Sequence, residues 1–94
     1  VGPTAKVRGA AAAETLAARL TRVGSGLGVN VTCLTTDGIG PVGRGIGPAP
    51  EARDILAVLQ RHPDAPADLA DRAVALAAAL LEIGGVAAAG EGAA

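Results

Sequence analysis

The stretch that decides the fold is a glycine- and proline-rich segment, Thr35-Thr36-Asp37-Gly38-Ile39-Gly40-Pro41-Val42-Gly43-Arg44-Gly45-Ile46-Gly47-Pro48-Ala49-Pro50-Glu51. It contains five glycines and three prolines. Because glycine is entropically costly in regular structure and proline lacks an N–H donor, this segment is neither helix interior nor strand interior. It is therefore a shaped loop, and long shaped loops inside compact domains are more often functional than accidental.

Upstream of the loop, the pattern is first helical and then strand-like. Within residues 10–27, apolar side chains recur at three- and four-residue steps, which predicts an amphipathic helix with Gly28 at its C-terminal end. Residues 29–35 are rich in β-branched side chains and predict a mostly buried strand. A helix leading into such a strand is typical of a right-handed βαβ unit, so the predicted fold class is α/β with a parallel sheet.

Downstream of the loop, two helices are predicted. Pro50 suits a first helical turn, and the helix that follows ends near residues 60–61. Residues 62–66 break the pattern, and a second helix runs from Pro66 to Ile83 before Gly84-Gly85 ends it. We expect residues 1–85 to form a partial α/β domain and residues 86–94 to form a flexible Ala/Gly tail.

Composition excludes several classes of function. A chain of 94 residues makes one domain at most, and the absence of aromatic residues and methionine leaves a thin core, so we expect a piece of a larger protein. A net charge of −1 with interspersed signs, and no aromatic to stack on bases, argue against a nucleic-acid partner. No apolar run is long enough to span a membrane, and the amino end lacks the form of a signal peptide. Cys33 is expected to be a buried, inert thiol.

Several features in and beside the loop have two interpretations, one as part of a binding site and one as ordinary structure. Residues 38–43 match the GxGxxG pattern after a predicted strand, but the dinucleotide interpretation requires a helix directly after the third glycine, and residues 44–48 intervene. Asp37, Glu51 and Asp54 surround a loop with exposed carbonyls, and carboxylates with carbonyls are typical cation ligands. Alternatively, Asp37 stabilises a turn, Glu51 lies at a helix start and Asp54 is simply solvated. Arg44 either binds an anion or pairs with one of these acids.

Two residues outside the loop, Lys6 and His62, also have side chains that could carry chemistry. Lys6 follows Gly2-Pro3-Thr4-Ala5 at the predicted exit of a strand, where it either contacts a phosphate or is simply solvated. His62 lies beside Pro63 in a helix–helix turn, which makes it a poor general base. No Ser/His/acid or Cys/His arrangement is present, so the residues by themselves name no reaction.

Three stretches carry a family resemblance: residues 1–7 (VGPTAKV), residues 34–38 (LTTDG) and residues 41–54 (PVGRGIGPAPEARD). In these stretches the chain resembles the thymidine phosphorylase and AMP phosphorylase family, whose pattern is close to VGPTAKV followed by LTDGxQPxGRGIGPALEAxD. The match extends over nearly the whole chain. The chain departs from the pattern at two places. Where the family has a polar residue followed by Gln, this chain has Ile39-Gly40, and where the family has Leu, this chain has Pro50.

The resemblance implies phosphorolysis, in which inorganic phosphate attacks the anomeric carbon of a nucleoside or nucleoside 5′-monophosphate and the free base leaves. It also implies that the chain is a fragment of a three-layer mixed-sheet α/β domain, from the subunit of a cytoplasmic homodimer active in pyrimidine metabolism and nucleotide salvage. The phosphate-binding loop and the base-binding residues lie upstream in the family. An isolated chain of this length is therefore expected to be inactive.

The resemblance also suggests site residues. Lys6 aligns with a substrate-contacting lysine of the AMP phosphorylase branch, although bacterial relatives with the same loop are taken as thymidine phosphorylases, so the substrate type stays open. Val42, Gly45 and Asp54 match positions that hold a monovalent cation, potassium, through two backbone carbonyls and an acid; Asp54 stands where the family has Glu. No catalytic residue is assigned.

An alternative from another class of function is a non-catalytic helical interaction module. Leu69, Ala73, Leu76, Leu80 and Ile83 form an apolar seam in an almost heptad rhythm, and such a seam packs against a partner helix as readily as against a sheet.

Overall fold

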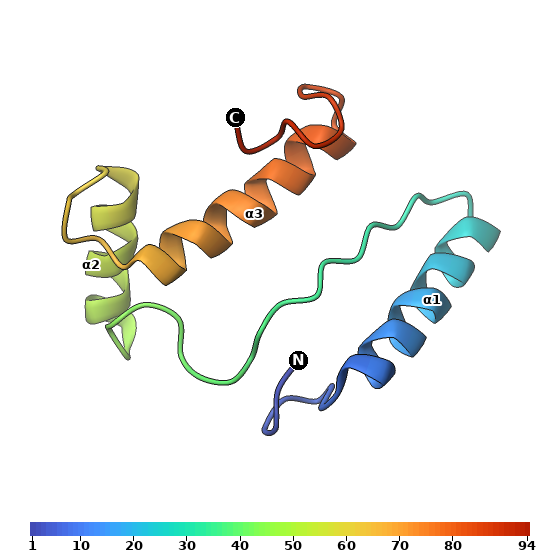
Figure 1. Cartoon of the computed structure of the whole chain (residues 1–94), viewed down its shortest axis with the longest axis horizontal. Coiled ribbons are helices and arrows are strands. Elements are labelled where there is room, and N and C mark those ends of the chain that lie inside the picture. Colours follow the sequence, from blue (N-terminus) through green and yellow to red (C-terminus); the bar gives the residue numbers. More distant parts are fainter. The chain divides into compact units, whose positions relative to one another are not determined.

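A computed structural model describes residues 1–94, and its regular structure consists of three helices: α1 (Ala10–Gly26), α2 (Pro48–Leu59) and α3 (Ala67–Ile83) (Figure 1). The chain divides into two compact units, Val1–Gly40 with α1 and Pro41–Ala94 with α2 and α3. Within the second unit α2 contacts α3. None of the three helices has the length and apolar character needed to cross a membrane.

The predicted α/β fold is wrong, because the structure contains no strand and no sheet. Residues 29–35, predicted as a buried strand, run as an extended segment after α1 (Figure 1), with Val29 56% and Leu34 49% exposed. A strand is stabilised by hydrogen bonds and side-chain contacts to a neighbouring strand, and this chain supplies none. β-branched residues favour a strand only where such a neighbour exists.

A single pair of backbone hydrogen bonds is the only trace of strand pairing in the first unit. The Val1 nitrogen donates to the Thr36 carbonyl at 2.8 Å, and the Gly38 N–H donates to the Val1 carbonyl at 2.7 Å. This is the bonding pattern of a parallel pair, but it covers one residue. It therefore joins the amino end to the start of the glycine-rich stretch without making a sheet.

The predicted helices are confirmed, and all three end with the same hydrogen-bond motif. After α1, the Val29 N–H donates to the Gly24 carbonyl at 2.8 Å and the Gly28 N–H donates to the Ser25 carbonyl at 3.2 Å. This Schellman motif places Gly28 in the left-handed region, with φ of 75°. The same pattern places Gly85 at φ 73° after α3 and Arg61 at φ 54° after α2. Arg61 is the only non-glycine residue in the chain with positive φ.

The structure has no hydrophobic core. No alanine, valine, leucine, isoleucine or cysteine side chain is buried, and leucines, valines and isoleucines of both units are exposed. The accessible surface is 7161 Å², whereas a folded monomer of this mass exposes about 4,900 Å². The thin core expected from the composition is thus confirmed, and much apolar surface stays open to solvent.

The carboxyl-terminal tail folds back onto α3. The Gly92 N–H donates to Glu82 Oε1 at 3.0 Å, and Gly92 is buried so closely against α3 that an added Cβ would collide with the Ala78 carbonyl oxygen. The flexibility of residues 86–94, and their separation from a domain of residues 1–85, stay predictions.

Candidate functional site

The glycine-rich loop of the second unit is held by two carboxylates. Three successive backbone N–H groups point at them: Gly43 donates to Asp68 Oδ2 at 3.0 Å, Arg44 to Asp54 Oδ2 at 2.8 Å and Gly45 to the same Asp54 oxygen at 2.7 Å. Asp54 lies in the middle of α2 and Asp68 in the first turn of α3. We call Asp54 and Asp68 the carboxylate clamp.

The clamp requires glycine at two loop positions. A Cβ on Gly43, which has φ of 80°, would lie 2.8 Å from Asp54 Oδ2. A Cβ on Gly45 would lie 2.5 Å from the Pro50 carbonyl carbon and 2.6 Å from the Pro50 Cβ. At Gly45 the close atoms include the Pro50 backbone, which has no room to relax, whereas at Gly43 the close atom is a side-chain oxygen and the positive φ itself disfavours any other residue. The loop therefore approaches α2 more closely than any side chain at these two positions permits.

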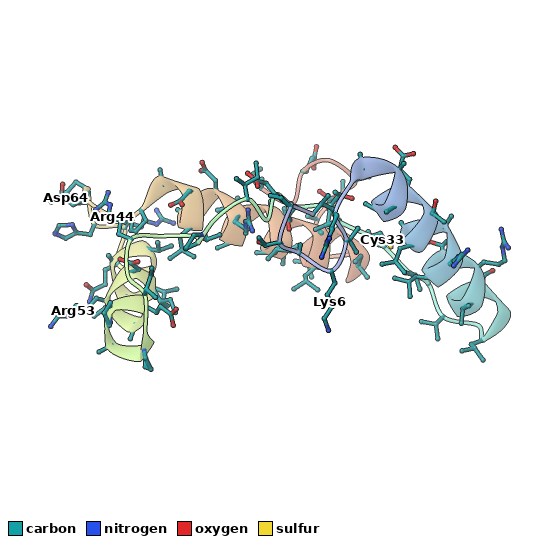
Figure 2. The ribbon with its side chains drawn as sticks, turned by 90° about the horizontal axis from the view of Figure 1, so that it is seen from below. Lys6, Cys33, Arg44, Arg53 and Asp64 are labelled. Atoms are coloured by element: carbon teal, nitrogen blue, oxygen red, sulfur yellow. The ribbon has the colours of Figure 1, made fainter.

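The Arg44 side chain binds the loop to the turn between α2 and α3. Its Nη1 donates to the backbone carbonyl of Asp64 at 2.6 Å, in the turn between α2 and α3. Figure 2 shows the Arg44 and Asp64 labels at the same end of the second unit. This bond engages one nitrogen of the guanidinium, and the Arg44 charge also acts on the Asp54 carboxylate. The two roles predicted for Arg44, binding an anion or pairing with an acid, stay predictions.

The hydrogen bonds also set the charge state of Asp54. The N–H groups of Gly45 and then of Arg44 lower the pKa of this carboxyl below its ordinary value, and the Arg44 charge adds to the effect, while burial opposes it. A carboxylate that accepts two amide hydrogen bonds is stabilised in its ionised form. Asp54 therefore carries its negative charge at neutral pH.

The structure brings together the residues of the predicted cation site. Gly45 bonds to Asp54, and Val42 lines a hollow of about 220 Å³ together with Asp54, Glu51, Ile55 and Leu69. No group of three or more His, Cys, Asp or Glu side chains is placed to hold a metal ion. A cation here would depend on Asp54 and on backbone carbonyls, a set of oxygen donors that suits a hard, weakly held ion. Potassium binding stays a prediction.

Lys6 lies in the first unit, in a compact loop at the amino end. The Gly2 N–H donates to the Val7 carbonyl and the Ala5 N–H donates to the Gly2 carbonyl, both at 3.1 Å. Gly2 is buried against Gly38, and Lys6 is exposed with its side chain directed away from the ribbon (Figure 2). The ammonium group is thus accessible, and its role as a phosphate contact stays a prediction.

The Lys6 loop adjoins the turn that opens the glycine-rich stretch. Asp37 Oδ1 accepts the Ile39 N–H at 2.7 Å, which makes an Asx turn, and the bonds of Val1 to Thr36 and Gly38 bring this turn beside the Lys6 loop. Of the three acids predicted around the long loop, Asp37 is therefore a turn residue in the first unit. Glu51 and Asp54 lie on α2 in the second unit.

The remaining candidates do not form reactive sites. Gly43 does not open a helix, because α2 begins at Pro48, so the dinucleotide interpretation of residues 38–43 gains no support. Cys33, expected to be buried, is exposed, since the strand that was to bury it does not form. His62 is exposed, and its Nδ1 accepts the Asp64 N–H at 3.1 Å, so that nitrogen is engaged in the turn.

Sequence reasoning missed Asp68. Its carboxylate accepts the Leu69 N–H through Oδ1 and the Gly43 N–H through Oδ2. In the sequence, Asp68 stands out only as an acidic residue in the first turn of α3, where an acid is usually explained by the helix dipole alone. Because that explanation was sufficient, nothing in the sequence linked Asp68 to a loop 25 residues away.

Comparison with known proteins shows which proteins contain a similar segment. Over 92 residues, 98% of the chain, it is 63% identical to a protein of Chelativorans sp. (strain BNC1) whose name is "Putative thymidine phosphorylase". This chain is homologous to a segment of thymidine phosphorylase-like proteins. Proteins of the same name from Parvibaculum lavamentivorans and Tolumonas auensis are each 59% identical over 92 residues. The thymidine phosphorylase resemblance seen in the sequence is thereby confirmed.

The homologous segment is short relative to those proteins. The chain spans 18% of the length of the thymidine phosphorylase-like relatives named above. No family model matches the chain, and no solved structure matches it. The aligned region covers 98% of the chain, so the similarity extends across both compact units.

Proposed function

We propose that this chain is part of a phosphorylase that transfers a pentosyl group from a nucleoside or nucleoside 5′-monophosphate to inorganic phosphate and releases the free base. The observation that carries the proposal is the 63% identity to a thymidine phosphorylase-like protein over 98% of the chain. In this reaction a phosphate oxygen bonds to the anomeric carbon, the glycosidic C–N bond breaks, and the base leaves with the electron pair. Such a step is accelerated by positioning and by charge stabilisation, which rigid loops supply.

The direct test is phosphate-dependent base release by the full-length protein with thymidine, uridine, AMP and CMP. Turnover of AMP or CMP would support a nucleotide phosphorylase, and turnover of thymidine alone would support a nucleoside phosphorylase. No base release from any of the four would contradict the proposal. Sedimentation of the same protein tests the expected homodimer.

In the nucleotide form of the proposal, Lys6 contacts the 5′-phosphate. Its exposed ammonium group sits on a compact loop, and a compact positive charge recognises phosphate well. Lys6→Ala in the full-length protein is expected to lower nucleotide use about tenfold more than nucleoside use, as loss of one charged contact predicts. Arg8→Ala removes an exposed charge from the same stretch and serves as the matched control. An unchanged preference in Lys6→Ala would contradict this role.

The cation part of the proposal assigns a potassium ion to the carbonyls of Val42 and Gly45 and the carboxylate of Asp54. The ion would supply positive charge beside the loop and add to its order. The thermal midpoint of the full-length protein is expected to be higher in potassium chloride than in choline chloride at equal ionic strength, and Asp54→Asn is expected to abolish the difference. Equal midpoints for the unaltered protein in both salts would contradict the site.

A helical interaction module remains the second candidate, because the apolar seam of α3 is open. Leu76, Leu80 and Ile83 are 45%, 70% and 60% exposed. Circular dichroism and sedimentation of the 94-residue chain separate the two candidates. A stable, helix-rich oligomer of one size favours the module, whereas a poorly folded or aggregating chain favours a phosphorylase fragment.

A further inference from the structure

Residues 43–45 present three successive backbone N–H groups, and each donates to a carboxylate oxygen. Successive N–H groups of a glycine-rich loop commonly hold a phosphate or another anion. Here these amides are already occupied: Gly43 bonds to Asp68, and Arg44 and Gly45 bond to Asp54. The anions that these amides bind are therefore the carboxylates of Asp54 on α2 and Asp68 on α3.

The opposite side of the same backbone presents acceptors. All peptide bonds in the chain are trans, and in a planar trans peptide the carbonyl points away from the N–H of the following residue. The Val42 carbonyl therefore points away from Asp68, and the Gly43 and Arg44 carbonyls point away from Asp54. This side of the loop suits groups that donate hydrogen bonds, such as sugar hydroxyls, or cations.

Asp68 is held in place by its own helix. Its Oδ1 accepts the Leu69 N–H at 2.9 Å, one of the first-turn amides of α3 that have no partner within the helix, while its Oδ2 accepts the Gly43 N–H. The helix start therefore fixes the carboxylate, and the carboxylate fixes the loop. No catalytic or binding role that we infer for the chain uses Asp68.

We propose that Asp68 is a positioning residue that, together with Asp54, holds residues 43–45 in one conformation, with their amides closed to substrate phosphate and the carbonyls of Val42, Gly43 and Arg44 directed away from the two carboxylates. The expected effect of Asp68 on the rate of phosphorolysis rests on the proposed function. The expected effect of Asp68 on the order of residues 43–45 does not. The two effects are therefore measured separately.

The first experiment is hydrogen exchange of the peptide covering residues 41–47 in the full-length protein. Asp68→Ala is expected to increase exchange there by about tenfold or more, as loss of one charge-assisted hydrogen bond predicts. Asp68→Asn keeps an acceptor oxygen for the Gly43 N–H and is expected to restore exchange to near the unaltered value. Asp71→Ala, on the exposed side of the same helix, is the matched control. Equal exchange in Asp68→Ala and Asp71→Ala would overturn the proposal.

A second pair of variants covers the case in which Asp68→Ala does not fold. Gly43→Ala places a Cβ at 2.8 Å from Asp54 Oδ2 and is expected to loosen the same peptide, whereas a Cβ on Gly40 meets no atom within 4 Å. Gly43→Ala should therefore exchange faster than Gly40→Ala at residues 41–47. Equal exchange in this pair would contradict the clamp.

The second experiment is a steady-state analysis of Asp68→Ala and Asp68→Asn. Because the loop amides are closed to phosphate, Asp68→Ala is expected to lower kcat about fivefold while KM for phosphate stays within about twofold, and Asp68→Asn should recover most of kcat. A kcat of Asp68→Ala equal to that of the unaltered protein would overturn the positioning role in phosphorolysis, because turnover would then not depend on the bond between Asp68 and the Gly43 N–H. If the unaltered protein lacks turnover, the proposed function fails, and the exchange experiment still decides the role of Asp68.

Discussion

Both compact units contain a long irregular segment next to a helix, and they hold it in different ways. In the first unit, residues 29–38 are attached by the Val29 bond to the end of α1, by the two bonds of Val1 and by a long bond from the Cys33 thiol to the Ala17 carbonyl at 3.9 Å. In the second unit, the loop that begins at Pro41 is attached by three backbone bonds to the carboxylate clamp and by the Arg44 side chain to the turn after α2. The first segment lies open, and the second is fixed.

The difference follows from where the partners come from. The clamp bonds join residues 9, 10 and 25 positions apart, all supplied by the two helices that follow the loop. A parallel strand needs another strand of the same sheet, which lies a crossover connection away. A loop of this kind can therefore order itself within a short chain, whereas a strand cannot.

The largest expected effect is the loss of the close approach between the loop and α2. Gly45→Ala places a Cβ against backbone atoms of Pro50 and is expected to destabilise the second unit by about 2–3 kcal/mol. Denaturant unfolding followed by circular dichroism measures the change. Gly40→Ala is the control, since its Cβ meets nothing within 4 Å. Equal stabilities of the two variants would show that the loop is as loosely held as residues 29–38.

A smaller effect is expected where the helices end. Arg61→Gly removes a left-handed non-glycine residue after α2 and is expected to stabilise the second unit by about 0.5–1 kcal/mol.

Gly28→Ala makes the reverse change after α1, at φ 75° and with no atom within 4 Å of the added Cβ, and is expected to destabilise the first unit by about 1 kcal/mol. Thermal unfolding of the two variants gives the signs. Destabilisation by Arg61→Gly would contradict the helix-end assignment.

The smallest expected effect lies in the extended segment. Val29→Thr keeps a β-branched side chain at a position that is largely exposed and pairs with no strand, so the stability of this chain should change by less than about 0.5 kcal/mol. The measurement is the denaturation midpoint compared with the unaltered chain. A loss larger than about 1 kcal/mol would indicate that the segment packs as a buried strand.

The elements that depend on nearby residues were predictable from the sequence. The three helices, the glycine after α1 and the proline near the start of α2 follow from periodicity and from the backbone chemistry of glycine and proline. The buried strand at residues 29–35 was not predictable, because the same β-branched pattern describes a strand with partners and an extended segment without them. Cys33 was misplaced for the same reason.

The candidate site was predictable in part. The importance of the glycine-rich loop and of Asp54 could be inferred from composition and resemblance, and the structure joins Asp54 to Gly45. The role of Asp68 depends on how α3 is placed after the turn at residues 60–66. No local pattern encodes that placement, so the second half of the clamp emerges only in three dimensions.

The measurement that tests the clamp most directly is a pH titration of the backbone amide resonances of Gly43, Arg44 and Gly45. Because the folded pKa of Asp54 is lowered from the ordinary value of 3.8, its contribution to stability is complete above that value and is lost as the pH falls through the folded pKa. The Arg44 and Gly45 amides should therefore move together, with a midpoint below 3.8. Amide shifts that stay constant through this range, or a midpoint at or above the ordinary value, would contradict the account.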